Sequence, residues 1–78
     1  MMNQQQVDWL YSQFRTQGLE ANVHSASART DSNWLYVPVY VALKDAYRKA
    51  QILQEIEDAW KNQNVAPGTH LLLMPAAN

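Results

Sequence analysis

Residues 32–43 read SNWLYVPVYVAL, and this stretch is the strongest β-strand signal in the chain. Successive side chains of a strand point to opposite faces of a sheet, so one face would be aliphatic and the other aromatic. The aliphatic set is Leu35, Val37, Val39, Val41 and Leu43, and the aromatic set, interrupted by Pro38, is Trp34, Tyr36 and Tyr40. A strand with a solvated face normally alternates apolar with polar residues. We therefore expect another molecule to cover the aromatic face.

Two amphipathic helices flank this strand. Residues 3–17 place apolar side chains at helical spacing, and Gly18 then ends the helix. The apolar stripe consists of Val7, Leu10, Tyr11 and Phe14. Trp9 lies opposite this stripe, so it is either a second contact with another molecule or an aromatic side chain that folds over the helix end.

The second helix is predicted over residues 46–62, with Asp45 as its N-cap. Its apolar stripe covers nearly half of the circumference. The stripe consists of Ala46, Ala50, Ile52, Leu53, Ile56, Ala59 and Trp60. A stripe this wide can pack on the sheet and on the first helix together.

Two further strands complete the expected sheet. Residues 19–28 alternate weakly, and the polar cluster 29–33 predicts a turn into the strand at 34–43, which gives a β-hairpin. Pro67 and Gly68 form a second turn, after which residues 69–74 predict a short third strand that Pro75 ends.

The predicted fold is α+β, a two-layer α-β-β-α-β arrangement in one small domain over residues 1–78, with both helices on one face of a mainly antiparallel three-stranded sheet. A right-handed crossover through the second helix makes the third strand parallel to the second. Pro38 lacks a backbone donor, so the second strand is expected at an edge, which favours the strand order 2-1-3. The alternative is the order 1-2-3, with Pro38 in a bulge.

In either order, one set of side chains gathers on the sheet face away from the helices. The predicted contact residues are Trp34, Tyr36, Tyr40, Leu72 and Met74, with Trp9 as a separate candidate, and His24 is expected nearby. We expect them to join two copies of the chain in a homodimer, or to dock the chain on a larger protein. Two alternatives are that the aromatic rings lie flat on the sheet, and that a bulge at Pro38 reverses their facing.

Composition narrows the class of protein. The chain has 78 residues, no cysteine, two histidines and a net charge of -1. A general nucleic-acid or acidic-membrane binder would need a surplus of Lys and Arg, so stacking of single-stranded bases on the aromatic face is disfavoured. The sequence predicts no membrane span and no signal peptide, and we expect a cytoplasmic protein. A domain this small is marginally stable alone, which favours oligomerisation.

The start of the second helix carries an alternative site. Lys44, Arg48 and Lys49 lie near its N-terminus, where positive charge opposes the helix dipole. Together with backbone donors they could bind a phosphate or carboxylate, which predicts a ligand-binding regulatory domain. The simpler interpretation is local pairing of Asp45 with Arg48 or Lys49 on a solvated surface, and we favour it.

The sequence lacks the motifs of catalysis. Two glycines exclude the phosphate-binding and dinucleotide loops, and no nucleophile lies at motif spacing from a base. His24 and His70 could meet only if their strands are neighbours, and no cysteine or suitably spaced acidic residue accompanies them. We therefore expect no metal, no cofactor and no self-contained enzyme; an active site would need a cleft between subunits.

Overall fold

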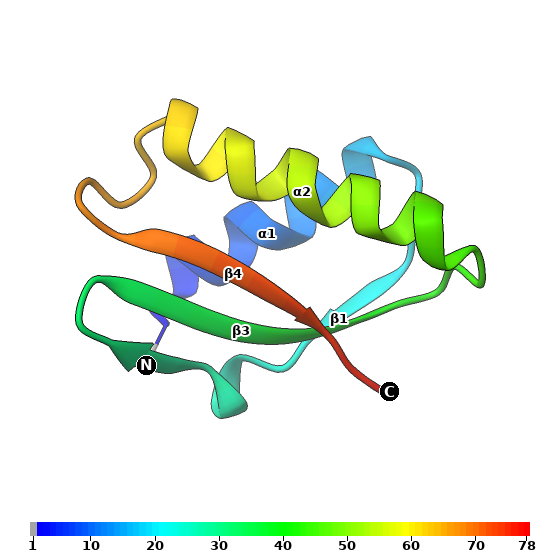
Figure 1. The fold of residues 1–78 in the computed structure, drawn as a ribbon, viewed down its shortest axis with the longest axis horizontal. Coiled ribbons are helices and arrows are strands. Elements are labelled where there is room, and N and C mark those ends of the chain that lie inside the picture. Colours follow the sequence, from blue (N-terminus) through cyan, green and yellow to red (C-terminus); the bar gives the residue numbers. More distant parts are fainter. Residues whose placement is uncertain (1) are drawn as a thin grey trace.

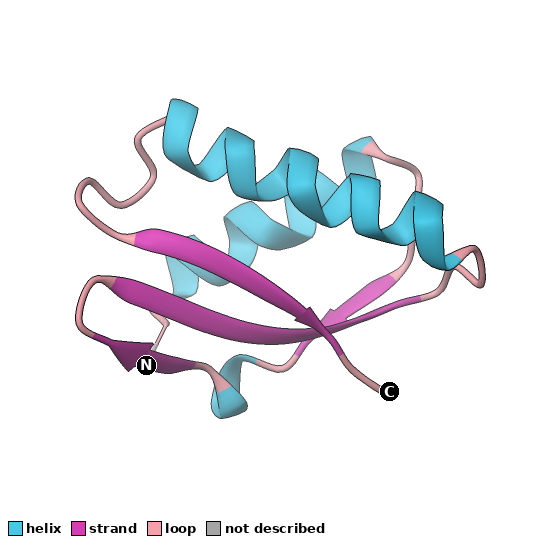
Figure 2. Cartoon of the chain, viewed as in Figure 1, coloured by secondary structure: helices cyan, strands magenta, loops and turns pink. Residues whose placement is uncertain are grey.

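The computed structural model describes residues 2–78 and has two layers (Figure 1). In chain order the elements are α1 (Gln4–Thr16), β1 (Ala21–Val23), the 3-10 turn η1 (Ser25–Ser27), β2 (Arg29–Asp31), β3 (Trp34–Val41), α2 (Ala46–Asn62) and β4 (His70–Pro75). Both helices lie on the same side of the sheet, as Figure 2 shows by element type. The predicted α+β class is confirmed.

The helices begin and end where their capping residues require. Asn3 Oδ1 accepts a hydrogen bond from the Gln6 N–H at 2.8 Å, and Gln6 Oε1 accepts one from the Asn3 N–H at 3.1 Å, which forms a capping box. Gly18 follows α1 with a φ of 72°, a conformation that glycine adopts without strain. At α2, the Asp45 side chain accepts the Arg48 N–H at 3.1 Å.

The core lies between the helices and one face of the sheet. The alternate aliphatic residues of β3 are all buried there, and the helices contribute the rest of the packing from one face each. The main buried side chains are Leu10, Phe14, Leu35, Val37, Val39, Val41, Ile52, Leu53, Ile56, Trp60, Leu71 and Leu73. The aliphatic alternation of residues 35–41 therefore defines which face of the sheet the helices cover.

Strand β3 is the centre of the sheet, so the favoured strand order 2-1-3 is wrong. β1 and β2 pair antiparallel with successive halves of β3 along one side, and β4 pairs parallel with β3 along the other. This is the alternative order 1-2-3, in which the most apolar strand is central. The parallel orientation of β3 and β4, linked through α2, agrees with the prediction.

Pro38 is accommodated in this central strand without a bulge. Its missing donor would face β1, and there β1 ends: His24 N–H still donates to the Pro38 carbonyl at 2.9 Å. A residue with an N–H at position 38 would have donated it to the His24 carbonyl. In this chain, that carbonyl accepts the Ser27 N–H of η1 at 3.0 Å instead. The interruption therefore lies in the partner strand and not in β3.

This interruption also changes the predicted first strand. Residues 19–28 form the short strand β1 and the turn η1, and residues 29–31, which were predicted as part of a turn, form β2. The connection from β2 to β3 is only Ser32 and Asn33.

None of the helices in residues 2–78 combines the length and apolarity that crossing a bilayer requires.

Candidate functional site

The outer face is the side of the sheet away from the helices. Strand pairing sets its side chains in rows: Asp31, Trp34 and His70 lie side by side, and the next row holds Arg29, Tyr36 and Leu72. Further along β3, Pro38 lies beside Met74. We define the outer face by these eight residues and Tyr40. Trp34, Tyr36, Leu72 and Met74 of the predicted contact residues lie together on it. Tyr40 lies farther along β3, beside Asn22 of β1.

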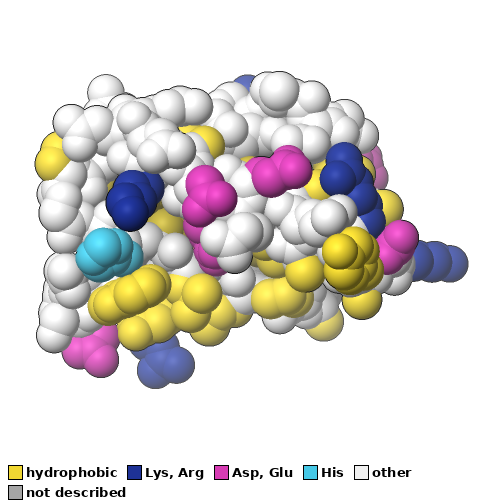
Figure 3. Space-filling view, turned by 45° about the horizontal axis from the view of Figure 1, so that its top comes forward, with side chains coloured by type: hydrophobic (Ala, Val, Ile, Leu, Met, Phe, Trp, Pro, Cys, Tyr) yellow, Lys and Arg dark blue, Asp and Glu magenta, His cyan; other side chains and the backbone are white. Residues whose placement is uncertain are grey.

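Large apolar side chains are exposed on this face. Trp34 keeps 40% of its surface accessible and Leu72 keeps 37%. The rings of Trp34 and Tyr36 are nearly parallel, with centroids 6.3 Å apart, and the His70 ring lies 4.9 Å from that of Trp34. Figure 3 shows groups of hydrophobic side chains along the lower margin of the molecule, beside a histidine. The sheet thus presents a cluster of aromatic rings that already contact one another.

Charged side chains border the aromatic rings along β2. Arg29 is the cross-strand neighbour of Tyr36, and Asp31 is that of Trp34. Both charged residues are exposed. Together with Thr30, Tyr36 and Met74 they line a hollow of about 370 Å³. The outer face therefore has an apolar centre and one positive and one negative group at the same rim, a composition typical of protein interfaces.

Two edges of the sheet are capped by side chains of the helices. The Val23 N–H of β1 donates to the Tyr11 hydroxyl at 3.0 Å, and the Leu73 N–H of β4 donates to Glu57 Oε2 at 2.8 Å. Pro75, also in β4, has no N–H to offer. Because pairing of strand edges needs free donors, these contacts oppose addition of a further strand at β1 or β4.

Glu57 lies half-buried at the β4 edge. Burial raises the pKa of its carboxyl above the ordinary value, the hydrogen bond from Leu73 lowers it in part, and the nearby charge of Asp58 raises it. No motif in the sequence distinguishes Glu57 from the other acidic residues of α2. Its contact with a backbone donor in β4 depends on how the helix packs on the sheet, which no local pattern reveals.

Trp9 does not belong to the outer face. Its ring meets Trp60 edge to face, with centroids 5.6 Å apart, and its Nε1–H donates to Gln63 Oε1 at 3.3 Å. Trp9 is partly buried against the core in the helical layer. Trp9 therefore packs across the helical layer against the C-terminal end of α2, a contact that neither interpretation of the sequence predicted.

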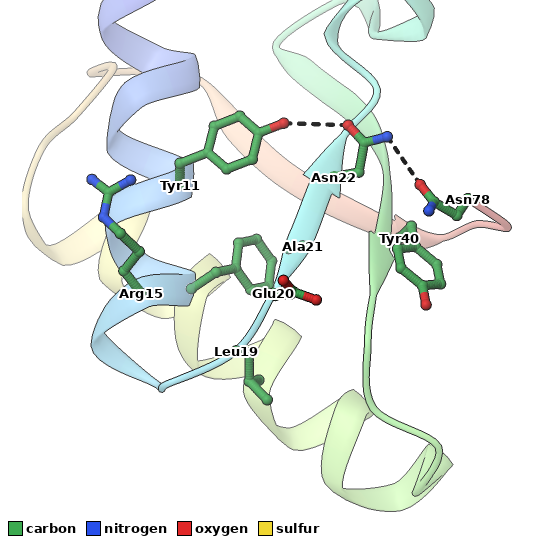
Figure 4. A pocket seen from close by; sticks show the side chains of 9 residues that line it. Tyr11, Arg15, Leu19, Glu20, Ala21, Asn22, Tyr40 and Asn78 are labelled. Carbon is green, nitrogen blue, oxygen red and sulfur yellow. Dashed lines mark hydrogen bonds between the residues drawn. The ribbon is translucent and has the colours of Figure 1, made fainter.

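A hollow of about 320 Å³ lies between α1, β1 and the C-terminal residues (Figure 4). Tyr11 extends from α1 toward Asn22, whose Oδ1 accepts the Tyr11 hydroxyl at 3.3 Å, and the Asn22 amide donates to Asn78 Oδ1 at 3.0 Å. These polar groups bond one another, so a ligand would have to displace existing hydrogen bonds. The sequence placed Tyr11 in the apolar stripe, and the role of its hydroxyl was missed.

The basic residues at the start of α2 are Lys44, Arg48 and Lys49. Lys44 and Arg48 are exposed and Lys49 is partly so. The carboxylate of Asp45 already accepts the Arg48 N–H at 3.1 Å. An anion would have to compete with this carboxylate for the donor, which favours the interpretation as an ordinary capped and solvated helix start.

The two histidines lie far apart in the sheet. His24 follows β1 on one side of β3, and His70 begins β4 on the other side. Across residues 2–78, no three side chains of His, Asp or Glu are grouped to hold a metal ion.

Comparison with family models, with curated proteins and with solved structures finds no match for this chain.

Proposed function

We propose that this chain is a protein–protein interaction module that binds another protein chain through the outer face. The observation that carries the proposal is the aromatic pair of the exposed Trp34 and the partly buried Tyr36, extended by the exposed Leu72 on the neighbouring strand. Strand β3 carries large apolar residues on both of its faces, although only one face contributes to the core. A cytoplasmic setting, with which the cysteine-free composition is compatible, is part of the proposal.

The energetics favour a macromolecular partner. Burial of apolar surface contributes roughly 25 cal/mol per Å², and aromatic side chains at the centre of an interface often account for 2 kcal/mol or more each, as an order of magnitude. The rings of Trp34 and Tyr36 already stack on one another, so binding would freeze few additional rotamers. The outer face is shallow and open, so it suits contact with another protein surface better than binding of a small ligand.

Charge opposes a nucleic-acid partner. Stacking of bases on aromatic side chains works beside a positive groove that follows the phosphates. Here Arg29 is accompanied by Asp31 at the same rim, and the chain as a whole carries a net charge of -1. The balance of these groups supports a protein partner.

The test is photo-crosslinking in cells that make the protein. Tyr36 is replaced by a photoreactive phenylalanine analogue, and the matched control carries the same analogue at Tyr47, which is 75% exposed on α2 in the other layer. We expect a specific adduct from position 36 and none of comparable yield from position 47. Equal yields from both positions, or no adduct from position 36, would contradict the proposal.

A further inference from the structure

We infer that the chain covering the outer face is a second copy of this protein, packed face to face about a two-fold axis that runs across the strands. The inference rests on the proposed function and names its partner. It follows from the order of charged and apolar groups in two neighbouring rows, and from the capped edges of the sheet.

The two rows are related in a way that makes them mutually complementary. One row holds Asp31, Trp34 and His70, and the other holds Arg29, Tyr36 and Leu72. Residues two apart on a strand are about 7 Å apart on the same face. A two-fold axis in the plane of the interface, midway between the rows and perpendicular to the strands, places each row opposite the other row of the second copy.

This operation pairs opposite charges. It sets Arg29 against Asp31 of the second copy and, by symmetry, Asp31 against Arg29 of the second copy. Packed sheets lie about 10 Å apart, a distance that an extended arginine and an aspartate span together. Pairs at a solvated rim contribute little affinity, but a like-charged arrangement is penalised, so they select the register.

The same operation joins the apolar centres. Trp34 comes to lie opposite Tyr36 of the second copy, and Leu72 comes to lie opposite His70 of the second copy. Each large ring thereby loses its exposure against another aromatic ring, and aromatic pairs of this kind stabilise an interface beyond the area they bury. No row is left facing a row of the same charge.

Other ways of pairing two copies are opposed by the structure. The β1 and β4 edges are capped at Val23 and Leu73 by Tyr11 and Glu57. The remaining edge strand, β2, has only three residues, Arg29–Asp31, which offers a short ladder at most. Association through the outer face leaves all of these contacts in place.

Charge-reversal variants test the register. Arg29→Asp and Asp31→Arg are purified separately, and the dimer dissociation constant is measured by sedimentation at low salt. In either variant both rim pairs become like-charged, so we expect each to dimerise at least about tenfold more weakly than the wild type. In an equimolar mixture the pairs between unlike variants are attractive again. We expect a heterodimer, identified by native mass spectrometry, with near wild-type affinity.

Two controls accompany this experiment. Arg48→Asp reverses an exposed charge on α2, away from the outer face, and is expected to dimerise like the wild type. Circular dichroism of each variant verifies that it is folded. Tyr36→Glu is expected to abolish dimerisation, because it places a charge at the centre of the interface.

The outcomes separate this inference from the proposed function. A wild type that stays monomeric at high concentration, or a mixture that dimerises no more tightly than the single variants, would overturn the two-fold arrangement. If position 36 nevertheless crosslinks to a different protein in cells, the interaction module stands and only its partner is wrong. If position 36 crosslinks to nothing, both proposals fail.

Discussion

Tyr11 and Glu57 each accept a backbone N–H at opposite edges of the sheet. Tyr11 comes from α1 and takes the Val23 N–H, while Glu57 comes from α2 and takes the Leu73 N–H. Each side chain satisfies a donor that would otherwise face solvent or another strand. The helical layer therefore both covers the core and closes the sheet at its two sides.

Tyr11→Phe should destabilise the chain by about 1 kcal/mol. The ring is retained, but the hydroxyl that accepts the Val23 N–H and donates to Asn22 is lost. Urea unfolding gives the change in free energy. The matched variant Asn22→Ala keeps the Tyr11–Val23 bond and should cost less; an equal or larger loss in Asn22→Ala would show that the Val23 contact is not the important one.

Glu57 should make stability depend on pH in a defined direction. Its pKa is raised in the folded protein, chiefly by burial, above an ordinary value of 4.5. Between the unfolded and folded pKa values, the folded protein holds a proton that the unfolded chain has released. The contribution of this group to stability is therefore complete below the unfolded pKa and is lost as pH rises through the folded pKa.

Glu57→Gln isolates this effect, because the amide oxygen can still accept the Leu73 N–H and does not titrate. Urea unfolding of both proteins from about pH 4 to about pH 7 should show a falling difference in stability, wild type minus variant. The control Glu20→Gln, at an exposed position, should keep the wild-type slope. Parallel curves for wild type and Glu57→Gln would refute the assignment.

At the scale of elements, local signals predicted the helices and long-range pairing determined the strands. The capping residues Asn3 and Asp45 and the stop at Gly18 are short-range features. The second helix begins directly after Asp45, as predicted, and the first begins directly after Asn3. The favoured strand order was wrong because it rested on the rule that proline avoids central strands. That rule considers only the missing backbone donor of the proline and not what lies opposite it. The sequence does not reveal that β1 ends opposite Pro38 and that Ser27 supplies the donor to His24.

The candidate site was predictable only where it depends on a local pattern. Alternation along residues 34–41 placed Trp34, Tyr36 and Tyr40 on one face, because a strand has a period of two. The charged residues of the rim were not predicted, since Arg29 and Asp31 were assigned to a turn. Their places beside Tyr36 and Trp34 follow only from the tight two-residue connection at Ser32 and Asn33.

That connection carries a testable strain. Ser32 has a φ of 56°, in the left-handed region that favours glycine, whereas Asn33 does not have a positive φ. Ser32→Gly should stabilise the chain by up to about 1 kcal/mol, because the relief of strain exceeds the added entropy of the unfolded chain. Asn33→Gly, the matched control, should be neutral or destabilising. Thermal unfolding of both variants distinguishes the two positions. Equal shifts in melting temperature would show that the backbone of Ser32 is not strained.

At the scale of the whole molecule, the proposed association would add stability to a small domain. A chain of 78 residues buries a modest share of its surface on folding, and no disulfide can form to stabilise it. The aromatic half of β3 adds nothing to the core, which lies on the other face. If a second copy covers the outer face, those residues stabilise the folded state through mass action, since the dimer binds only folded chains.

The melting temperature of the wild type should therefore rise with protein concentration, for example between about 5 μM and about 500 μM. The rise follows because the free energy that dimerisation adds to folding grows with the logarithm of the concentration. Tyr36→Glu, which places a charge in the proposed interface, should melt at one temperature over the same range. Tyr47→Glu, at an exposed position on α2, should keep the wild-type dependence. Because unfolding of a monomer is independent of concentration, a flat wild-type curve would show that folding and association are not coupled in this chain.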